Sequence, residues 1–247
     1  ILTSLGSYFW GDQLIIAMSG ARPADRKRDF DLFTVTENLA IAAGIPKPKL
    51  YVIEDTAMNA FATGRDPNHA IVVATTGIIE RLERRELEGV IAHELSHVKN
   101  YDIRLMLVVG VLVGTIAFVT DWFLRSLWWG GRDRDRENRG GGIVMLLGIV
   151  LAVLAPFLAT IIKLAISRQR EYLADASGAL LTRYPEGLAR ALAKLSGDKE
   201  VLEAATNATA HLYITNPFKG KEFGAWFAGL FDTHPPIEER IKRLRTM

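Results

Sequence analysis

The sequence predicts an α+β fold that is mainly α-helical, with a small antiparallel sheet and two long apolar helices. Three observations lead to this prediction. Apolar residues recur at helical spacing in several segments, and three short β-prone runs follow one another between residues 49 and 75. Two nearly uncharged runs of about 20 residues each come later in the chain.

The composition excludes several classes of protein. Hydrophobic residues make up 49% of the 247 residues, and the formal net charge is +2. Because basic and acidic residues nearly balance, the sequence does not indicate a nucleic-acid partner. The chain has no cysteine, so disulfides and thiolate metal sites are excluded. Histidine and carboxylate side chains are then the strong metal ligands available.

The elements outside the apolar runs follow from periodicity and turn residues. We expect a helix from about Asp29 to Ala43, because apolar residues recur at helical spacing before a glycine and two prolines. The runs KLYVIE, NAFATG and AIVVAT predict the antiparallel sheet. The segment from Glu86 to Asn100 predicts a helix with one buried apolar stripe. A helix starting near Pro185 and a last helix in PPIEERIKRLR, with its charges facing solvent, complete the fold.

The two apolar runs extend from Ile103 to about Leu124 and from Ile143 to Ile166. Both are long enough to cross the hydrocarbon core of a bilayer. The alternative is a pair of buried helices in a soluble core, but such helices seldom stay apolar all round at this length. Pro156 inside the second run favours the membrane, and so do three tryptophans that lie at or just beyond the C-terminal end of the first run, where an interfacial aromatic belt would be: Trp122, Trp128 and Trp129.

The charges that flank the apolar runs do not determine their orientation. The connecting segment from Gly130 to Gly142 is rich in glycine and mixed charges, which predicts a solvated loop. If both runs span a membrane, this loop lies on the side opposite the rest of the chain, although its four arginines favour the cytoplasm. Comparable positive charge lies at the other ends of the runs, on Lys99, Arg104, Arg168 and Arg170.

HELSH, His93 to His97, is the strongest chemical signal. Residues four apart share one face of a helix, so both imidazoles can bind one metal ion, and Glu94 then points toward the open side of the metal. A catalytic zinc ion needs three protein ligands and one open position for water. The alternative is two polar histidines on the exposed face of an ordinary helix.

The third ligand must be distant, because no histidine follows His97 at the metzincin offset. EYLAD offers Glu171 as the ligand and Asp175, on the same helix face, as a carboxylate that orients a ligating histidine. Alternatively, Glu171 pairs with a nearby arginine such as Arg168, and Asp175 is exposed. Three other histidines compete for the ligand position: His69, His211 and His234.

HELSHVKNYD and EYLAD, together with NAFATG, AIVVATTGIIERL and THPPIEERI, resemble the HtpX family of membrane zinc metalloproteases, which is related to the CAAX prenyl proteases. The likeness covers nearly the whole chain. It implies a gluzincin-type zincin domain with two transmembrane helices inserted after the metal helix. It also implies one Zn²⁺ per chain, held by His93, His97 and Glu171, with Glu94 as the general base.

The same resemblance implies roles for two further segments. Asn59, Ala60 and Phe61 would lie on the edge strand beside the cleft and bind an extended peptide through backbone hydrogen bonds. His234 would donate to the developing oxyanion. Without the family, the first segment reads equally well as a plain sheet edge, and His234 as a solvated residue at a helix entry.

We expect three parts in the chain. Residues 21–102 and 167–247 would form the protease domain, and residues 103–166 the transmembrane helical hairpin with its Arg- and Gly-rich loop. The chain starts at Ile1 without a methionine, and the family has two N-terminal membrane helices. We therefore expect residues 1–20 to be the remnant of an N-terminal membrane helix and an interfacial segment.

The expected function is peptide-bond hydrolysis by an endopeptidase in the quality control of misfolded membrane proteins. The family implies a multi-pass protein of a prokaryotic plasma (inner) membrane with a cytoplasmic catalytic domain, so the expected partners are polypeptide substrates and the lipid bilayer, with no nucleic acid. Two alternatives stay open. One is a metal-stabilised membrane scaffold that binds unfolded segments without cutting them, and the other is a processing peptidase that acts on prenylated tails. The sequence does not predict an oligomeric state.

Overall fold

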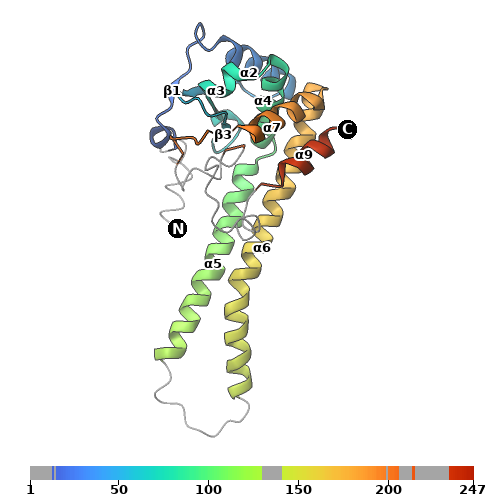
Figure 1. Ribbon diagram of the computed structural model, residues 1–247. Helices are drawn as coiled ribbons and strands as arrows, with labels where there is room; N and C mark the ends of the chain where they lie inside the picture. Colours follow the sequence, from blue (N-terminus) through green and yellow to red (C-terminus); the bar gives the residue numbers. More distant parts are fainter. Residues whose placement is uncertain (1–12, 14, 130–140, 199, 206–212, 215–233) are drawn as a thin grey trace. The chain divides into compact units, whose positions relative to one another are not determined.

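The computed structural model describes residues 13, 15–129, 141–198, 200–205, 213–214 and 234–247 (Figure 1). The expected remnant in residues 1–20 and the loop from Gly130 to Gly142 lie largely outside these residues. The chain divides into two compact units. The first unit combines Ile1–Arg104 with Arg168–Met247, and the second is Leu105–Ser167.

The first unit contains a four-stranded sheet in the order β1-β2-β4-β3. Its strands are β1 (Arg22–Pro23), β2 (Lys49–Ile53), β3 (Ala60–Thr63) and β4 (Ile71–Thr75). β3 pairs antiparallel with β4, and β1 pairs antiparallel with β2. β2 and β4 run parallel. The order leaves β3 at one edge of the sheet.

The parallel pair corrects the expectation of a purely antiparallel sheet. β3 and β4 form a hairpin whose connection contains the short 3-10 helix η1 (Pro67–His69). Gly64, with φ +119°, opens that connection, where a Cβ atom would collide with the backbone of His69. β3 occupies one side of β4, so β2 pairs on the other side. The segment that connects β2 to β3 therefore passes across β4. Run lengths and turn residues do not distinguish this order from a meander.

Among the described residues of the first unit, the helices that accompany the sheet include α2 (Phe30–Ala43), α3 (Thr76–Arg81), α4 (Arg84–Lys99), α7 (Pro185–Gly197) and α9 (Ile237–Leu244). α4 is central and contacts α2, α7 and β3. Its apolar stripe is fully buried in the main core, at Leu87, Val90, Ile91 and Leu95. Gly89 lets α7 approach closely, because a Cβ atom there would lie 2.5 Å from the Leu188 nitrogen. The helix that carries HELSH is therefore rigidly held.

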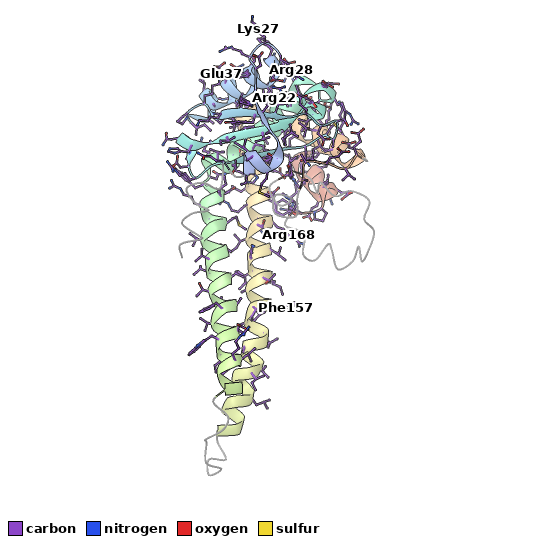
Figure 2. The ribbon with its side chains drawn as sticks, turned by 90° about the vertical axis from the view of Figure 1, so that its left-hand side faces the viewer. Arg22, Lys27, Arg28, Glu37, Phe157 and Arg168 are labelled. Carbon is purple, nitrogen blue, oxygen red and sulfur yellow. The ribbon has the colours of Figure 1, made fainter. Side chains whose placement is uncertain are left out.

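α5 (Asp102–Trp129) and α6 (Gly141–Thr182) contain the two apolar runs and lie side by side through the second unit (Figures 1 and 2). Asp102–Arg125 and Gly148–Thr182 are long and apolar enough to cross a membrane. Only 6% and 12% of their most apolar windows are buried, and side chains such as Phe157 are exposed (Figure 2). This exposure argues against two core helices of a soluble protein, which would be mostly buried.

Candidate metal centre

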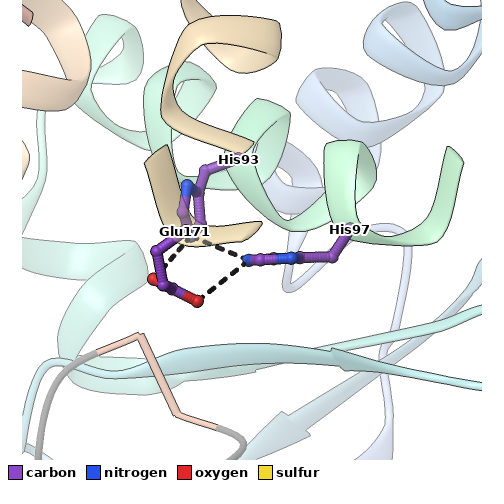
Figure 3. A group of neighbouring side chains, drawn as sticks. All are labelled: His93, His97 and Glu171. Atoms are coloured by element: carbon purple, nitrogen blue, oxygen red, sulfur yellow. Dashed lines mark hydrogen bonds and ion pairs between the residues drawn. The ribbon is translucent and has the colours of Figure 1, made fainter. Parts of the chain in front are cut away.

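α4 and α6 bring His93, His97 and Glu171 together (Figure 3). The two histidine Nε2 atoms are 3.1 Å apart. Glu171 Oε2 lies 3.7 Å from the Nε2 of His93, and Glu171 Oε1 lies 3.4 Å from the Nε2 of His97. One ligand atom from each residue lies within 4.8 Å of the other two. Glu171 nevertheless follows His97 by 74 positions in the sequence, since 171 − 97 = 74.

The donor set fits a zinc ion. Tetrahedral ligand atoms at bond lengths of about 2.0–2.1 Å lie roughly 3.3 Å from one another. The two imidazole nitrogens are 3.1 Å apart, and the Glu171 carboxylate approaches them through different oxygens, at 3.7 Å for Oε2 and 3.4 Å for Oε1, which are all near that value. Two imidazole nitrogens and one carboxylate oxygen are also a ligand set typical of catalytic zinc, which keeps its fourth position open. Small adjustments of the side chains would complete the coordination.

Carboxylates hold the other nitrogen of each imidazole. His93 Nδ1 lies 2.9 Å from Asp175 Oδ1, and His97 Nδ1 lies 2.7 Å from Asp102 Oδ2. Asp175, the carboxylate that we expected to orient a ligating histidine, lies beside His93. We did not predict Asp102 from the sequence. Such contacts leave the Nε2 lone pair of each neutral ring directed at a metal.

Arg240 of α9 is a second residue that we did not predict. We expected the charges of this helix to face solvent, but the Arg240 side chain is fully buried. It donates to both Asp175 oxygens, at 2.9 and 2.7 Å, and its Nη1 lies 3.3 Å from Glu171 Oε2. Although burial alone would lower the pKa of Arg240, these carboxylates raise it above the ordinary value. Arg240 therefore stays charged and balances two buried acids.

Glu94 is buried with only 3% of its surface exposed, and burial raises its pKa to about 7. The negative charge of Glu171 raises the pKa of Glu94 further. The charge of His97 and a hydrogen bond to the backbone of Ala62 in β3 lower it, but they do not outweigh burial. Burial lowers the pKa of His97, but hydrogen bonds to Asp102 and Glu171 outweigh it and raise the pKa to about 10. A metal ion would have to displace that proton. Burial lowers the pKa of His93.

The competing histidines lie in different places. His234 Nδ1 is 3.1 Å from Glu171 Oε2, so this residue does belong to the neighbourhood of the centre. His69 lies in η1, where it contacts Asp66 and Arg65, and it is not one of the grouped metal-capable residues in the described part of the chain. His211 falls outside the described residues.

β3, which carries the expected peptide-binding residues Ala60 and Phe61, is an edge strand. Asn59 precedes it, is buried, and accepts a hydrogen bond from the Ala60 nitrogen through its own Oδ1. The edge is partly in use within the chain itself. The Ile214 nitrogen donates to the Ala60 oxygen at 3.0 Å, and the Glu94 carboxylate accepts a hydrogen bond from the backbone of Ala62. An added peptide strand would have to replace at least one of these bonds.

Comparison with known proteins gives the class of this protein. Residues 26–247 match the family model described as peptidase family M48, and the chain therefore belongs to this family and is a metalloprotease. The resemblance to the HtpX proteases is likewise confirmed by individual relatives. The chain is 52% identical over 241 residues to the "Protease HtpX homolog" of Dictyoglomus thermophilum, an alignment that covers 98% of this chain and 77% of the relative.

Two further proteins extend the comparison. The "Protease HtpX homolog" of Caldanaerobacter subterraneus subsp. tengcongensis is 48% identical over 244 residues, which are 98% of this chain and 80% of the relative. The crystal structure of S. mikatae Ste24p is similar in fold, with a TM-score of 0.57 at 19% identity. That similarity covers 98% of this chain and 56% of Ste24p. At this level of identity the similarity supports the fold, and the chemistry follows from the residues of the metal centre.

Proposed function

We propose that this chain is a membrane-bound zinc endopeptidase in which His93, His97 and Glu171 hold one Zn²⁺ and Glu94 is the general base. The observation that carries the proposal is that the Glu171 carboxylate of α6 lies 3.4 to 3.7 Å from two Nε2 atoms of α4, the helix that also carries the buried Glu94. Membership of peptidase family M48 supports the same chemistry.

A zinc ion bound there would lower the pKa of a water molecule and polarise the carbonyl of the scissile peptide bond. The carboxylate of Glu94 would accept the proton of the attacking water and return it to the leaving amine. A carboxylate whose pKa is raised by burial suits both directions of transfer, because it binds a proton readily at neutral pH. No covalent enzyme intermediate is needed.

His234 is our candidate for stabilising the oxyanion, because its ring is 3.1 Å from a ligand carboxylate and therefore near the reacting carbonyl. Asp175 would orient His93. A substrate would bind as an added strand along β3, through the backbone of Asn59, Ala60 and Phe61. Of these three residues, Ala60 has its backbone carbonyl on the outer side of β3, where it accepts from the Ile214 nitrogen, whereas the N–H and C=O of Asn59 both bond to Thr75.

We further propose that α5 and α6 anchor the enzyme in a prokaryotic plasma membrane as a multi-pass protein, with the protease domain in the cytoplasm. The domain would consist of residues 21–102 and 167–247 and the hairpin of residues 103–166. Two exposed apolar helices support the anchoring. Misfolded membrane proteins are the proposed substrates, since a protease domain continuous with membrane helices is held close to chains exposed at the bilayer.

The test is Glu94→Gln in detergent-purified protein, with casein as the substrate. Gln has the same shape but cannot take a proton, so we expect zinc content near that of the parent and cleavage reduced by a factor of at least about 10². Glu88→Gln, at a partly exposed position of the same helix where the carboxylate pairs with Arg84, is the matched control and should cleave like the parent. Wild-type cleavage by Glu94→Gln would refute Glu94 as the base.

A further inference from the structure

His97 differs from His93 in the source of its carboxylate partner. Asp175, beside His93, lies one turn after Glu171 on the same face of α6. Asp102, beside His97, is the first residue of α5 and follows the metal helix after two residues. Both aspartates are buried, with 3% and 4% of their surface exposed. A buried carboxylate is costly without a cation, so each needs a charge partner.

Each aspartate has an arginine. Arg240 holds Asp175, and Arg170 donates to Asp102 Oδ1 through both Nε and Nη2. Arg170 Nη2 also donates to the Asn100 oxygen at 3.0 Å, and so secures the end of α4. Two Arg–Asp–His chains therefore end on the two imidazoles that face Glu171. Arg170 itself immediately precedes Glu171 in α6.

The backbone between His97 and Asp102 is bent to make this contact. Tyr101 has φ +56°, in the left-handed region that bulky residues rarely adopt. This turn ends α4 and starts α5 with Asp102 beside the His97 ring. Tyrosine does not favour this conformation by itself. The contacts on either side of the turn therefore hold Tyr101 in it.

We propose that Asp102 is a positioning residue for the metal centre, holding His97 with its Nε2 toward the ion, and that Arg170 fixes Asp102 in place. The proposal rests on the zinc site proposed above. Asp102 accepts the Nδ1 proton of His97, which leaves the lone pair on Nε2, and its negative charge makes that nitrogen a stronger donor. Without Asp102 the ring can rotate or take the other tautomer.

The position of this pair links the metal centre to the apolar helices along the chain. Asp102 begins α5, and Arg170 lies in α6 just after its apolar segment. A shift of the backbone at either residue would therefore move Asp102 and, through its hydrogen bond, the ring of His97. The chain Arg170–Asp102–His97 thus makes zinc affinity depend on residues at the start of one helix and within the other.

The experiment measures zinc affinity of the full chain in detergent by competition with a chromophoric chelator, and the melting temperature of the metal-free protein. Asp102→Ala should weaken zinc binding by about 10- to 100-fold. Asp102→Asn keeps the shape of the side chain and should also weaken zinc binding. The melting temperature of its metal-free form should stay near that of the parent. Arg170→Ala should weaken binding less, and Arg170→Lys should recover part of that loss.

Asp29→Ala is the matched control, because Asp29 is also a buried aspartate with a bidentate arginine, Arg22, at 2.8 and 3.0 Å. It should lower the melting temperature and leave zinc affinity unchanged. If Asp102→Asn and Asp102→Ala bind zinc within about twofold of the parent, where a 10-fold loss is expected, the positioning role is refuted. If the parent itself fails to bind zinc, the proposed function fails instead.

Discussion

Gly178 of α6 faces the backbone of His93 in α4, where a Cβ atom at position 178 would lie 3.1 Å from the His93 nitrogen and 3.3 Å from its Cα. The absence of a side chain therefore sets how closely the two helices approach at the metal centre. Because Glu171 lies two turns earlier on α6, this approach also sets its distance from the histidines.

We expect Gly178→Val to separate the two helices and weaken zinc binding by at least about 10-fold, since overpacking of this kind costs about 1–3 kcal/mol. The measurement is zinc competition with a chelator. Gly114→Val is the control, because nothing lies within 4 Å of a Cβ atom at Gly114. Equal zinc affinities for both variants would show that close helix approach is not required.

Arg240→Met tests the charge balance beneath the centre. Removing the cation leaves Asp175 and Glu171 without their buried partner, and breaking such a pair costs about 3–5 kcal/mol. We expect the melting temperature of the metal-free protein to fall by roughly 10 °C. Zinc should restore part of this loss, because the ion supplies positive charge at Glu171.

The control for Arg240→Met is Lys242→Met, an exposed cation on the same helix, which should change the melting temperature little. Differential scanning fluorimetry with and without excess zinc measures both variants. A metal-free Arg240→Met protein as stable as the parent would contradict the charge-balance argument.

Ile214→Pro tests the edge-strand proposal. Proline has no N–H, so the hydrogen bond from Ile214 to the Ala60 oxygen is lost and this carbonyl becomes available to a peptide strand. We expect a severalfold increase in kcat/KM for an extended peptide. Ile214→Val keeps the N–H and the apolar side chain and should behave like the parent. A folded, zinc-loaded Ile214→Pro protein with unchanged or lower kcat/KM would argue against substrate pairing at Ala60.

Much of the fold follows from local sequence. The helix before Gly44 and the helix that carries HELSH are found where periodicity predicted them, and the two apolar helices contain the long apolar runs. Their boundaries carry local chemical signals, such as the left-handed Gly44 that ends α2 at φ +69°. Glu171 could be proposed for the centre because EYLAD places two carboxylates on one helix face.

The remaining features depend on contacts between distant segments. The parallel pairing of β2 with β4 depends on which side of β4 is free, and this is not encoded in either strand alone. Arg240 looks like a surface charge in IEERIKRL, and only the packing of α9 places it between Asp175 and Glu171. Asp102 had a local signal, as an acid five positions after His97, but its role requires the turn at Tyr101.

The most direct test of the account is the zinc content of the detergent-purified chain, measured by mass spectrometry of the metal after dialysis against a weak chelator. The account predicts about one zinc ion per chain in the parent and a large loss in both His97→Ala and Glu171→Ala. Full zinc content in Glu171→Ala, or no zinc in a folded and active parent, would contradict the metal centre described above.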